Sequence, residues 1–171
     1  MDDTLAAAQR KRYLHEIMTF FPDGEARLDG LCAAVAKLLN CQHCSLALVS
    51  DRTVFAIGSY KVPVRVLDFD RPRPFVPYER SEVFEITDEI RAALHLDLQG
   101  FDIEYLVRVP VLVKGLYVGD LIVADEKARI SGLSESQWNG LQAAAELAAK
   151  ILIRSKAIRS QLYGLADVVV P

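Results

Sequence analysis

Apolar residues recur at helical spacing along the first forty residues. In residues 4–21 they lie three or four positions apart, and Pro22-Asp23-Gly24 ends this first predicted helix. Residues 25–40 carry a second apolar stripe, for which Asp23 is the expected N-cap. Cys32 lies in the middle of that stripe. Because a free cysteine packs as a small hydrophobic residue, we expect Cys32 in the core.

Runs of β-branched and aromatic residues predict strands further along. Residues 45–50 and 53–60 indicate an antiparallel pair joined by a short turn. Residues 103–113 and 116–125 indicate a second pair, with the tight turn Lys114-Gly115 between them. We expect the strand of residues 103–113 to bend at its proline.

The region between the two pairs has no regular pattern. Residues 61–82 contain four prolines and many charged residues, and they predict a long irregular loop of the kind that serves as a lid or a binding loop. A short apolar piece, residues 83–86, leads to Thr87, which is a suitable N-cap for a short helix ending near Leu96.

The last predicted helix has the clearest start signal. Ser134 and Gln137 form a capping box, and Leu133 and Trp138 occupy the positions of a hydrophobic staple. The pattern continues to about residue 162, with apolar residues alternating at spacings of three and four, as in coiled coils.

An apolar edge of that helix continues past the length that one domain covers. It is formed by Ile151, Ile158 and Leu162. One domain alone would leave this edge uncovered.

The order of elements, together with two segments, resembles a GAF domain. Residues 28–51, LDGLCAAVAKLLNCQHCSLALVSD, are similar to the helix and first strand of that family. Residues 105–125, YLVRVPVLVKGLYVGDLIVAD, are similar to its later Val-Pro strand, glycine-containing hairpin and Gly-x-Leu strand. Residues 133–153 match its terminal helix, and the resemblance extends over residues 25–155.

The resemblance implies an α+β fold and a regulatory role, often within a homodimer whose terminal helices pair. It implies a GAF-like, PAS-related antiparallel sheet of five or six strands, with helices packed on one face, a small-molecule pocket on the other and long terminal helices. Residues 1–24 would be an N-terminal dimer or signalling helix, 25–155 the domain itself, and 156–171 the end of the last helix and the tail. Members of this family bind cyclic nucleotides, bilins or haem, a few reduce methionine sulfoxide, and many have no known ligand, so the fold does not choose a function.

Composition narrows the classes of partner. The 171 residues are 51% hydrophobic and 25% charged, which suits one soluble domain. A net charge of −3 argues against a nucleic-acid binder. No apolar run is long enough to span a membrane, and the acidic start is unlike a signal peptide. Three cysteines without an export signal favour the cytoplasm.

The stretch Cys41-Gln42-His43-Cys44 raises the possibility of thiol or zinc chemistry. It follows a predicted helix C-terminus, where the helix dipole disfavours a thiolate. No second cysteine or histidine pair is present to complete a zinc site. We interpret Cys41 and Cys44 as a turn and a core residue; a thiol-based redox enzyme is the less favoured alternative.

Known ligand and enzyme signatures are missing from the chain. No cysteine follows Cys44, as the family's sulfoxide reductases and bilin attachment require, and residues 124–127 lack the family's cyclic-nucleotide signature. Haem through His95 would rest on a lone histidine, which is more often a packing residue. No hydrolase or nucleotide-binding motif is present. We predict a non-enzymatic protein with no cofactor and no metal.

Arg108 is the strongest candidate for ligand contact. Strand alternation places it among apolar residues on one face, where a buried guanidinium needs an anion or an acidic partner. It binds a carboxylate or phosphate of a ligand, pairs with an acidic residue of the 61–82 loop, or extends its charged end to water. Five aromatic residues are candidates for the same cavity, although each also fits a plain core: Tyr60, Phe55, Phe84, Tyr105 and Tyr117.

Two functions are consistent with these patterns. The first is a sensory domain that binds a small anionic or aromatic molecule between the sheet and residues 61–102, and signals through its terminal helices to a downstream protein or fused effector. The second is a ligand-free module for dimerisation or scaffolding.

Overall fold

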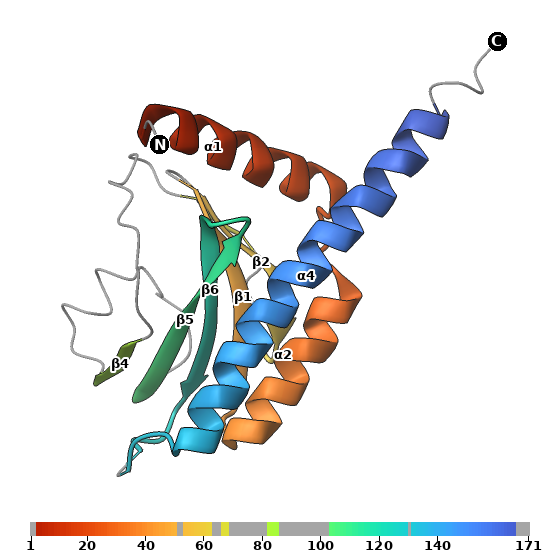
Figure 1. Ribbon diagram of the computed structural model, residues 1–171. Coiled ribbons are helices and arrows are strands. Elements are labelled where there is room, and N and C mark those ends of the chain that lie inside the picture. The colour runs from red at the N-terminus through yellow and green to blue at the C-terminus, as the bar shows by residue number, and fades with distance from the viewer. Residues whose placement is uncertain are drawn as a thin grey trace.

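The computed structural model describes residues 3–50, 53–62, 66–68, 82–85, 103–129 and 131–166. The helix predicted to end near Leu96, the histidine His95 and the turn at 51–52 lie outside these residues. In chain order the elements are α1 (Asp3–Phe20), α2 (Ala26–Leu39), β1 (His43–Val49), β2 (Thr53–Tyr60), β3 (Val66–Asp68), β4 (Glu82–Glu85), β5 (Tyr105–Val113), β6 (Leu116–Asp125) and α4 (Glu135–Ala166), as Figure 1 shows.

The described strands form one antiparallel sheet in the order β3-β2-β1-β6-β5-β4. The four central strands are long, at seven to ten residues, and the edge strands β3 and β4 have three and four. The expected α+β architecture with an antiparallel sheet is confirmed. The irregular loop predicted for residues 61–82 needs a correction, because β3 lies inside it and pairs with the start of β2.

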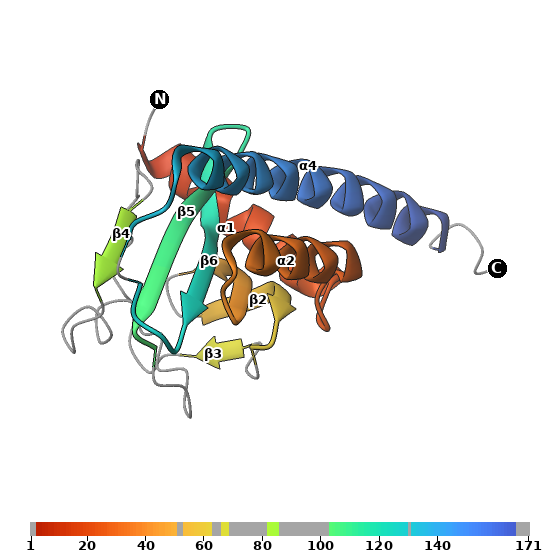
Figure 2. The same cartoon turned by 90° about the horizontal axis from the view of Figure 1, so that it is seen from below.

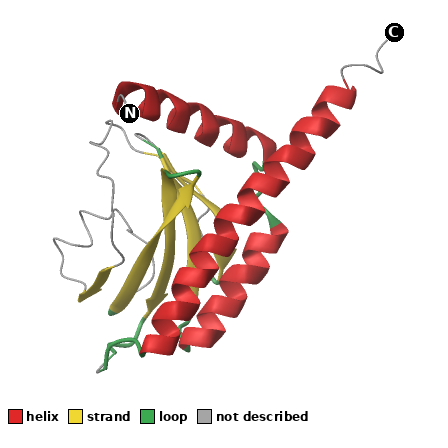
Figure 3. Cartoon of the chain, viewed as in Figure 1, coloured by secondary structure: helices red, strands yellow, loops and turns green. Residues whose placement is uncertain are grey.

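Helices α2 and α4 lie side by side on one face of the sheet (Figures 1 and 2). Figure 3 shows them as a helical layer beside the strands. The strands turn one set of alternate residues towards this layer, including Leu46, Val107, Val109 and Leu121, each at most 4% exposed. These residues and the inner faces of the helices form the core, in which Cys32 is fully buried, as predicted.

Glycine allows the closest contacts of the core. A Cβ on Gly58 of β2 would lie 2.7 Å from Cβ of Leu28, so α2 approaches the sheet at this point only because the side chain is missing. A Cβ on Gly119 of β6 would overlap the backbone carbonyl of Ala47 on the neighbouring β1.

Helix α1 crosses the end of the sheet where β1 ends and β6 begins (Figure 1). Its residues Leu14 and Ile17, and Phe21 just after it, are buried in the same core. Arg10 fixes the helix to the sheet, because its guanidinium donates hydrogen bonds to the backbone carbonyls of Tyr117 and Val49.

The helix ends confirm one predicted cap and correct another. Backbone N–H of Gln137 donates to Oγ of Ser134 at 3.3 Å, and Oε1 of Gln137 accepts from N–H of Ser134 at 3.0 Å, which is the predicted capping box. The N-cap of α2 is Glu25 rather than Asp23. Asp23 lies in the turn that ends α1, where Gly24 has a φ of 88°.

The β5–β6 hairpin forms as predicted. Lys114 and Gly115 have φ values of 52° and 79°, and two central residues with positive φ match the twist of a hairpin. The predicted bend at Pro110 is wrong, since β5 is one continuous strand. β4 pairs only as far as Arg108, so Pro110 lies beyond the end of β4, where a strand needs no N–H donor on that side.

Helix α4 buries its predicted apolar seam in its own domain. Leu141, Ala148 and Leu152 are fully buried there, and the seam continues with Ser155, whose Oγ accepts a hydrogen bond from Arg27 at 2.6 Å. Farther along, Ile158 and Leu162 are 43% and 55% exposed. No helix within the described residues has the length and apolarity needed to cross a bilayer.

Candidate functional site

A buried ion pair lies on the sheet face turned away from α2 and α4. Arg108 of β5 is 3% exposed and Asp120 of β6 is 4% exposed. Nη1 of Arg108 lies 3.8 Å from Oδ2 of Asp120. Asp120 of the neighbouring strand is thus an acidic partner of Arg108, and the pairing predicted with the 61–82 loop stays a prediction, because most of that loop lies outside the described residues. Arg108 also makes further contacts beyond this pair.

A β-bulge places Asp120 on this face. Near the hairpin, β6 has one residue more than β5, so the register shifts by one position. Without the extra residue, the hairpin would set Asp120 opposite Val109, whose side chain faces the helices. With it, Asp120 lies opposite Pro110 and diagonally next to Arg108. The bulge therefore creates the ion pair.

Tyr117 completes the group. Its hydroxyl donates a hydrogen bond of 2.7 Å to Oδ2 of Asp120, and its side chain is buried. The same carboxylate oxygen thus faces both a phenol and a guanidinium. We refer to Arg108, Asp120 and Tyr117 as the site cluster.

Burial dominates the electrostatics of the site cluster. It raises the pKa of Asp120, although the hydrogen bond from Tyr117 and the charge of Arg108 oppose the shift. Burial, together with the nearby Asp120 carboxylate, raises the pKa of Tyr117 well above its usual value, so its hydroxyl stays a proton donor. Oδ1 of Asp120 is buried and has no hydrogen-bond partner among the described residues. This oxygen is a free acceptor.

The six candidates from the sequence do not meet in one place. Of these, Arg108 and Tyr117 belong to the site cluster. Phe55 and Tyr105 pack in the core on the helix side, and Tyr60 packs against that core partly buried. Alternation along each strand separates them from Arg108.

The backbone of Phe84 pairs with Leu106 in the β4–β5 ladder, and its side chain lies outside the described residues. Asp120 was not among the candidates predicted from the sequence. A carboxylate in the middle of the apolar strand 116–125 was the available signal, because such a group needs a partner when buried.

The cysteines occupy packing positions. Cys44 of β1 is 1% exposed, and burial raises the pKa of its thiol well above the usual value. Cys41 is half-buried, and burial raises its pKa as well. Both thiolates are disfavoured, which supports the interpretation of the pair as a turn and a core residue. No group of three or more metal-ligating side chains occurs among the described residues.

No family model matches the sequence, and no curated protein matches it as a relative. Solved structures do match. The blue-light-absorbing form of the PixJ GAF domain of Thermosynechococcus elongatus has a TM-score of 0.59 and 14% identity, over 91% of this chain and 95% of that one. The GAF domain of an Acinetobacter phosphoenolpyruvate-protein phosphotransferase has a TM-score of 0.57 and 17% identity, over 88% and 96%.

A phycoerythrobilin-bound GAF domain from a cyanobacterial phytochrome matches with a TM-score of 0.58 and 11% identity, over 94% of this chain and 98% of that one. All three structures have the sheet and helices arranged as in this chain. The chain therefore has the GAF-domain fold, which confirms the resemblance seen in the sequence.

Proposed function

We propose that this chain is a non-enzymatic sensory or regulatory domain that binds a small molecule at the site cluster. The observation that carries the proposal is a buried ion pair with a free carboxylate oxygen, on the sheet face that α2 and α4 do not cover. A buried ion pair is a poor source of stability, because its desolvation offsets its attraction. A binding site, by contrast, needs a few polar groups fixed among apolar ones.

The site cluster favours a ligand with both a donor and an apolar surface. Oδ1 of Asp120 requires an N–H or O–H group from the ligand. Beside the cluster lie Ala47, directly opposite Asp120 on β1, and Leu106 and Ala124, which pair across β5 and β6. These small or apolar residues suit a flat ring. An anionic ligand would bind together with a proton on Asp120, because the neutral acid does not repel an anion that approaches Arg108.

Exposed apolar residues on α4 support output through a homodimer. Leu147, Ile158 and Leu162 are 47%, 43% and 55% exposed. With Ile151 they lie at spacings of four, seven and four residues, which is close to a helical seam. A second copy that packs along this seam would bury them. The downstream partner in this proposal is a signalling protein or a fused effector.

A thermal-shift screen with a panel of small molecules tests ligand binding. The panel should include nucleobases, nucleotides, aromatic carboxylates and linear tetrapyrroles. A ligand at a hundred times its Kd stabilises the folded state by about 2.7 kcal/mol. For a chain of this length, that raises Tm by about 5 to 10 °C. The variant Arg108→Met should lose the shift while its dimer, measured by sedimentation, stays intact.

The second candidate is a ligand-free dimerisation module. The seam on α4 favours it equally, because a dimer needs no ligand. The same screen separates the two functions: a ligand that stabilises wild type but not Arg108→Met supports sensing. If no compound stabilises either protein, the scaffold is supported, and equal stabilisation of both proteins would place the ligand away from the site cluster.

A further inference from the structure

We propose that Arg10 transmits the state of the site cluster to the terminal helices, which assigns a positioning role to a residue outside the site. This role rests on the proposed function, because Arg10 would carry the effect of ligand binding to α1 and α4. The side chain of Tyr117 belongs both to the site cluster and to the contact with α1.

Arg10 contacts Tyr117 in two ways. Its Nε donates a 2.8 Å hydrogen bond to the backbone carbonyl of Tyr117, and its guanidinium lies 5.6 Å from the centre of the Tyr117 ring. A further hydrogen bond from Nη2 reaches the carbonyl of Val49, at the end of β1. Arg10 is thus held by the backbone of two strands and lies over a side chain of the site.

Tyr117 connects Arg10 to the ligand position. Its hydroxyl bonds to Oδ2 of Asp120, and the other oxygen of that carboxylate is the free acceptor. A ligand that donates to Oδ1 of Asp120 draws negative charge away from Oδ2 and so weakens the hydrogen bond that Oδ2 accepts from Tyr117. When the Tyr117 hydroxyl is released, the ring turns, and the contact between the ring and Arg10 changes with it. In this proposal the ring has two arrangements, one with its hydroxyl bonded to Asp120 and one with the hydroxyl released, and ligand binding discriminates between them.

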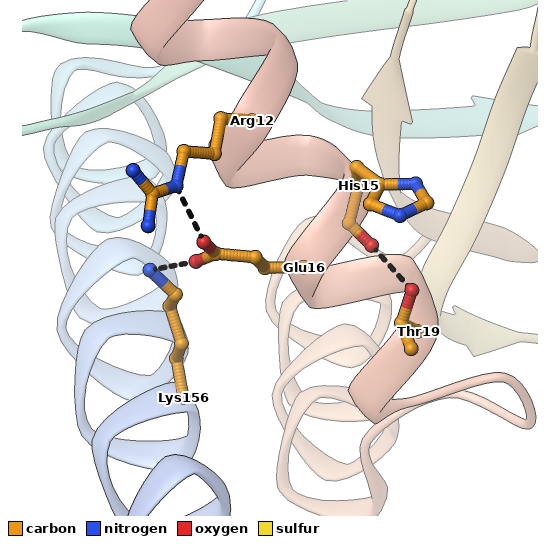
Figure 4. Close-up of polar contacts among 5 residues, drawn as sticks. All are labelled: Arg12, His15, Glu16, Thr19 and Lys156. Carbon is orange, nitrogen blue, oxygen red and sulfur yellow. Dashed lines mark hydrogen bonds and ion pairs between the residues drawn. The ribbon is translucent and has the colours of Figure 1, made fainter.

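Helix α1 in turn contacts the distal half of α4. Nζ of Lys156 lies 2.5 Å from Oε2 of Glu16 and 4.8 Å from the centre of the Tyr13 ring. Figure 4 shows Glu16 between Lys156 of α4 and Arg12 of its own helix. The rings of Phe20 and Tyr163 stack at 5.3 Å. A shift of α1 therefore reaches the part of α4 that carries the exposed seam.

These contacts make a continuous physical route from Asp120 through Tyr117 and Arg10 to α1, and from there to α4. Proximity alone does not establish coupling between two sites. The test must show that a change at the cluster alters the helices, and that it does so only when Arg10 is present.

A double-mutant cycle followed by amide hydrogen exchange provides this test on the full chain. Tyr117→Phe breaks the hydrogen bond to Asp120 without removing the ring. In the wild-type background it should change exchange rates in residues 10–20 and 152–163 by about threefold or more, within the range of coupled residues. In the Arg10→Gln background, the same substitution should leave those rates unchanged.

Arg12→Gln is the matched control. It removes the same charge from α1, but Arg12 is exposed and its ion pair is to Glu16 of the same helix. The effect of Tyr117→Phe should survive in this background. Lys156→Gln should leave the effect at α1 unchanged and reduce it at α4, where the stack of Phe20 on Tyr163 remains. If Tyr117→Phe does not fold, the cycle can be repeated with Asp120→Asn, which weakens the same hydrogen bond between Tyr117 and Asp120.

Two results overturn the inference. One is an effect of Tyr117→Phe that stays within β5 and β6 in the wild-type background. The other is an effect that reaches α1 equally in wild type and in Arg10→Gln. The cycle contains no ligand, so a failed ligand search would refute the proposed function without changing this outcome.

Discussion

Removing one member of the Arg108–Asp120 pair should cost far more stability than replacing both. At 3.8 Å and an effective dielectric constant of about 20, the two charges attract each other by about 4 kcal/mol. Desolvation of both charges offsets much of that gain, so the pair adds little over an apolar pair of similar volume. A single charge left without its partner keeps the desolvation cost and loses the attraction.

We therefore expect Asp120→Leu and Arg108→Met each to lower the free energy of unfolding by about 3 kcal/mol, at the lower end of values for broken buried pairs because Arg108 has further contacts. The double variant should lie within about 1 kcal/mol of wild type. Urea unfolding at one fixed protein concentration measures all four proteins.

The exposed pair Arg12–Glu16 serves as the control for this cycle. Its two residues are four apart on one helix, and such surface pairs couple by under about 1 kcal/mol. If the effects of Asp120→Leu and Arg108→Met simply add, the two charges do not interact. The residues of the site cluster would then lie next to each other without stabilising each other.

The pH dependence of stability tests the same group. The folded-state pKa of Asp120 is raised above its usual 3.8, so at pH values between the unfolded and folded pKa the folded protein holds a proton that the unfolded chain has lost. Its contribution to stability is fully present below the unfolded pKa and falls as pH rises from there through the folded pKa. Asp120→Asn should remove this part of the slope, and an unchanged slope would refute the shift.

Three further predictions follow from the geometry. Gly119→Ala forces a Cβ into the carbonyl of Ala47 and should lower stability by about 3 kcal/mol or more in urea unfolding, whereas full stability would contradict the observed strand approach. Cys44 should react with a thiol reagent only on unfolding, since it is buried with a raised pKa; fast labelling of the native protein would disprove this. Replacing Ile158 and Leu162 together by Glu should dissociate the proposed dimer in sedimentation without lowering Tm of the monomer, and an unaffected dimer would place its interface elsewhere.

Local signals predicted the parts of the fold that depend on neighbouring residues. The capping box of Ser134 and Gln137 and the turn at Lys114 and Gly115 each depend on a few adjacent side chains or backbone angles. The buried stripe around Cys32 follows from helical spacing alone. The predicted N-cap of α2 was wrong because two nearby acidic residues, Asp23 and Glu25, can each serve as the cap. Asp23 lies in the turn after α1, and Glu25 is the cap.

The site depends on a feature without a local signature. If the pairing at the turn continued without a shift, Asp120 would lie opposite Val109. The extra residue in β6 places the carboxylate on the same face as Arg108 instead. Side-chain types alone could not reveal that shift. For the same reason, Phe55 and Tyr105 looked equivalent to Tyr117 in the sequence, although strand alternation buries them on the opposite side of the sheet.

The most direct test of the central claim is native mass spectrometry of the protein freshly purified from cells. Wild type and the variant Arg108→Met/Asp120→Leu would be measured side by side. The account predicts a wild-type dimer that carries a small organic molecule, and a double variant that is folded and dimeric but free of that molecule. The same bound mass on both proteins would place the ligand away from the site cluster, and no bound mass on a wild-type dimer would favour the ligand-free module.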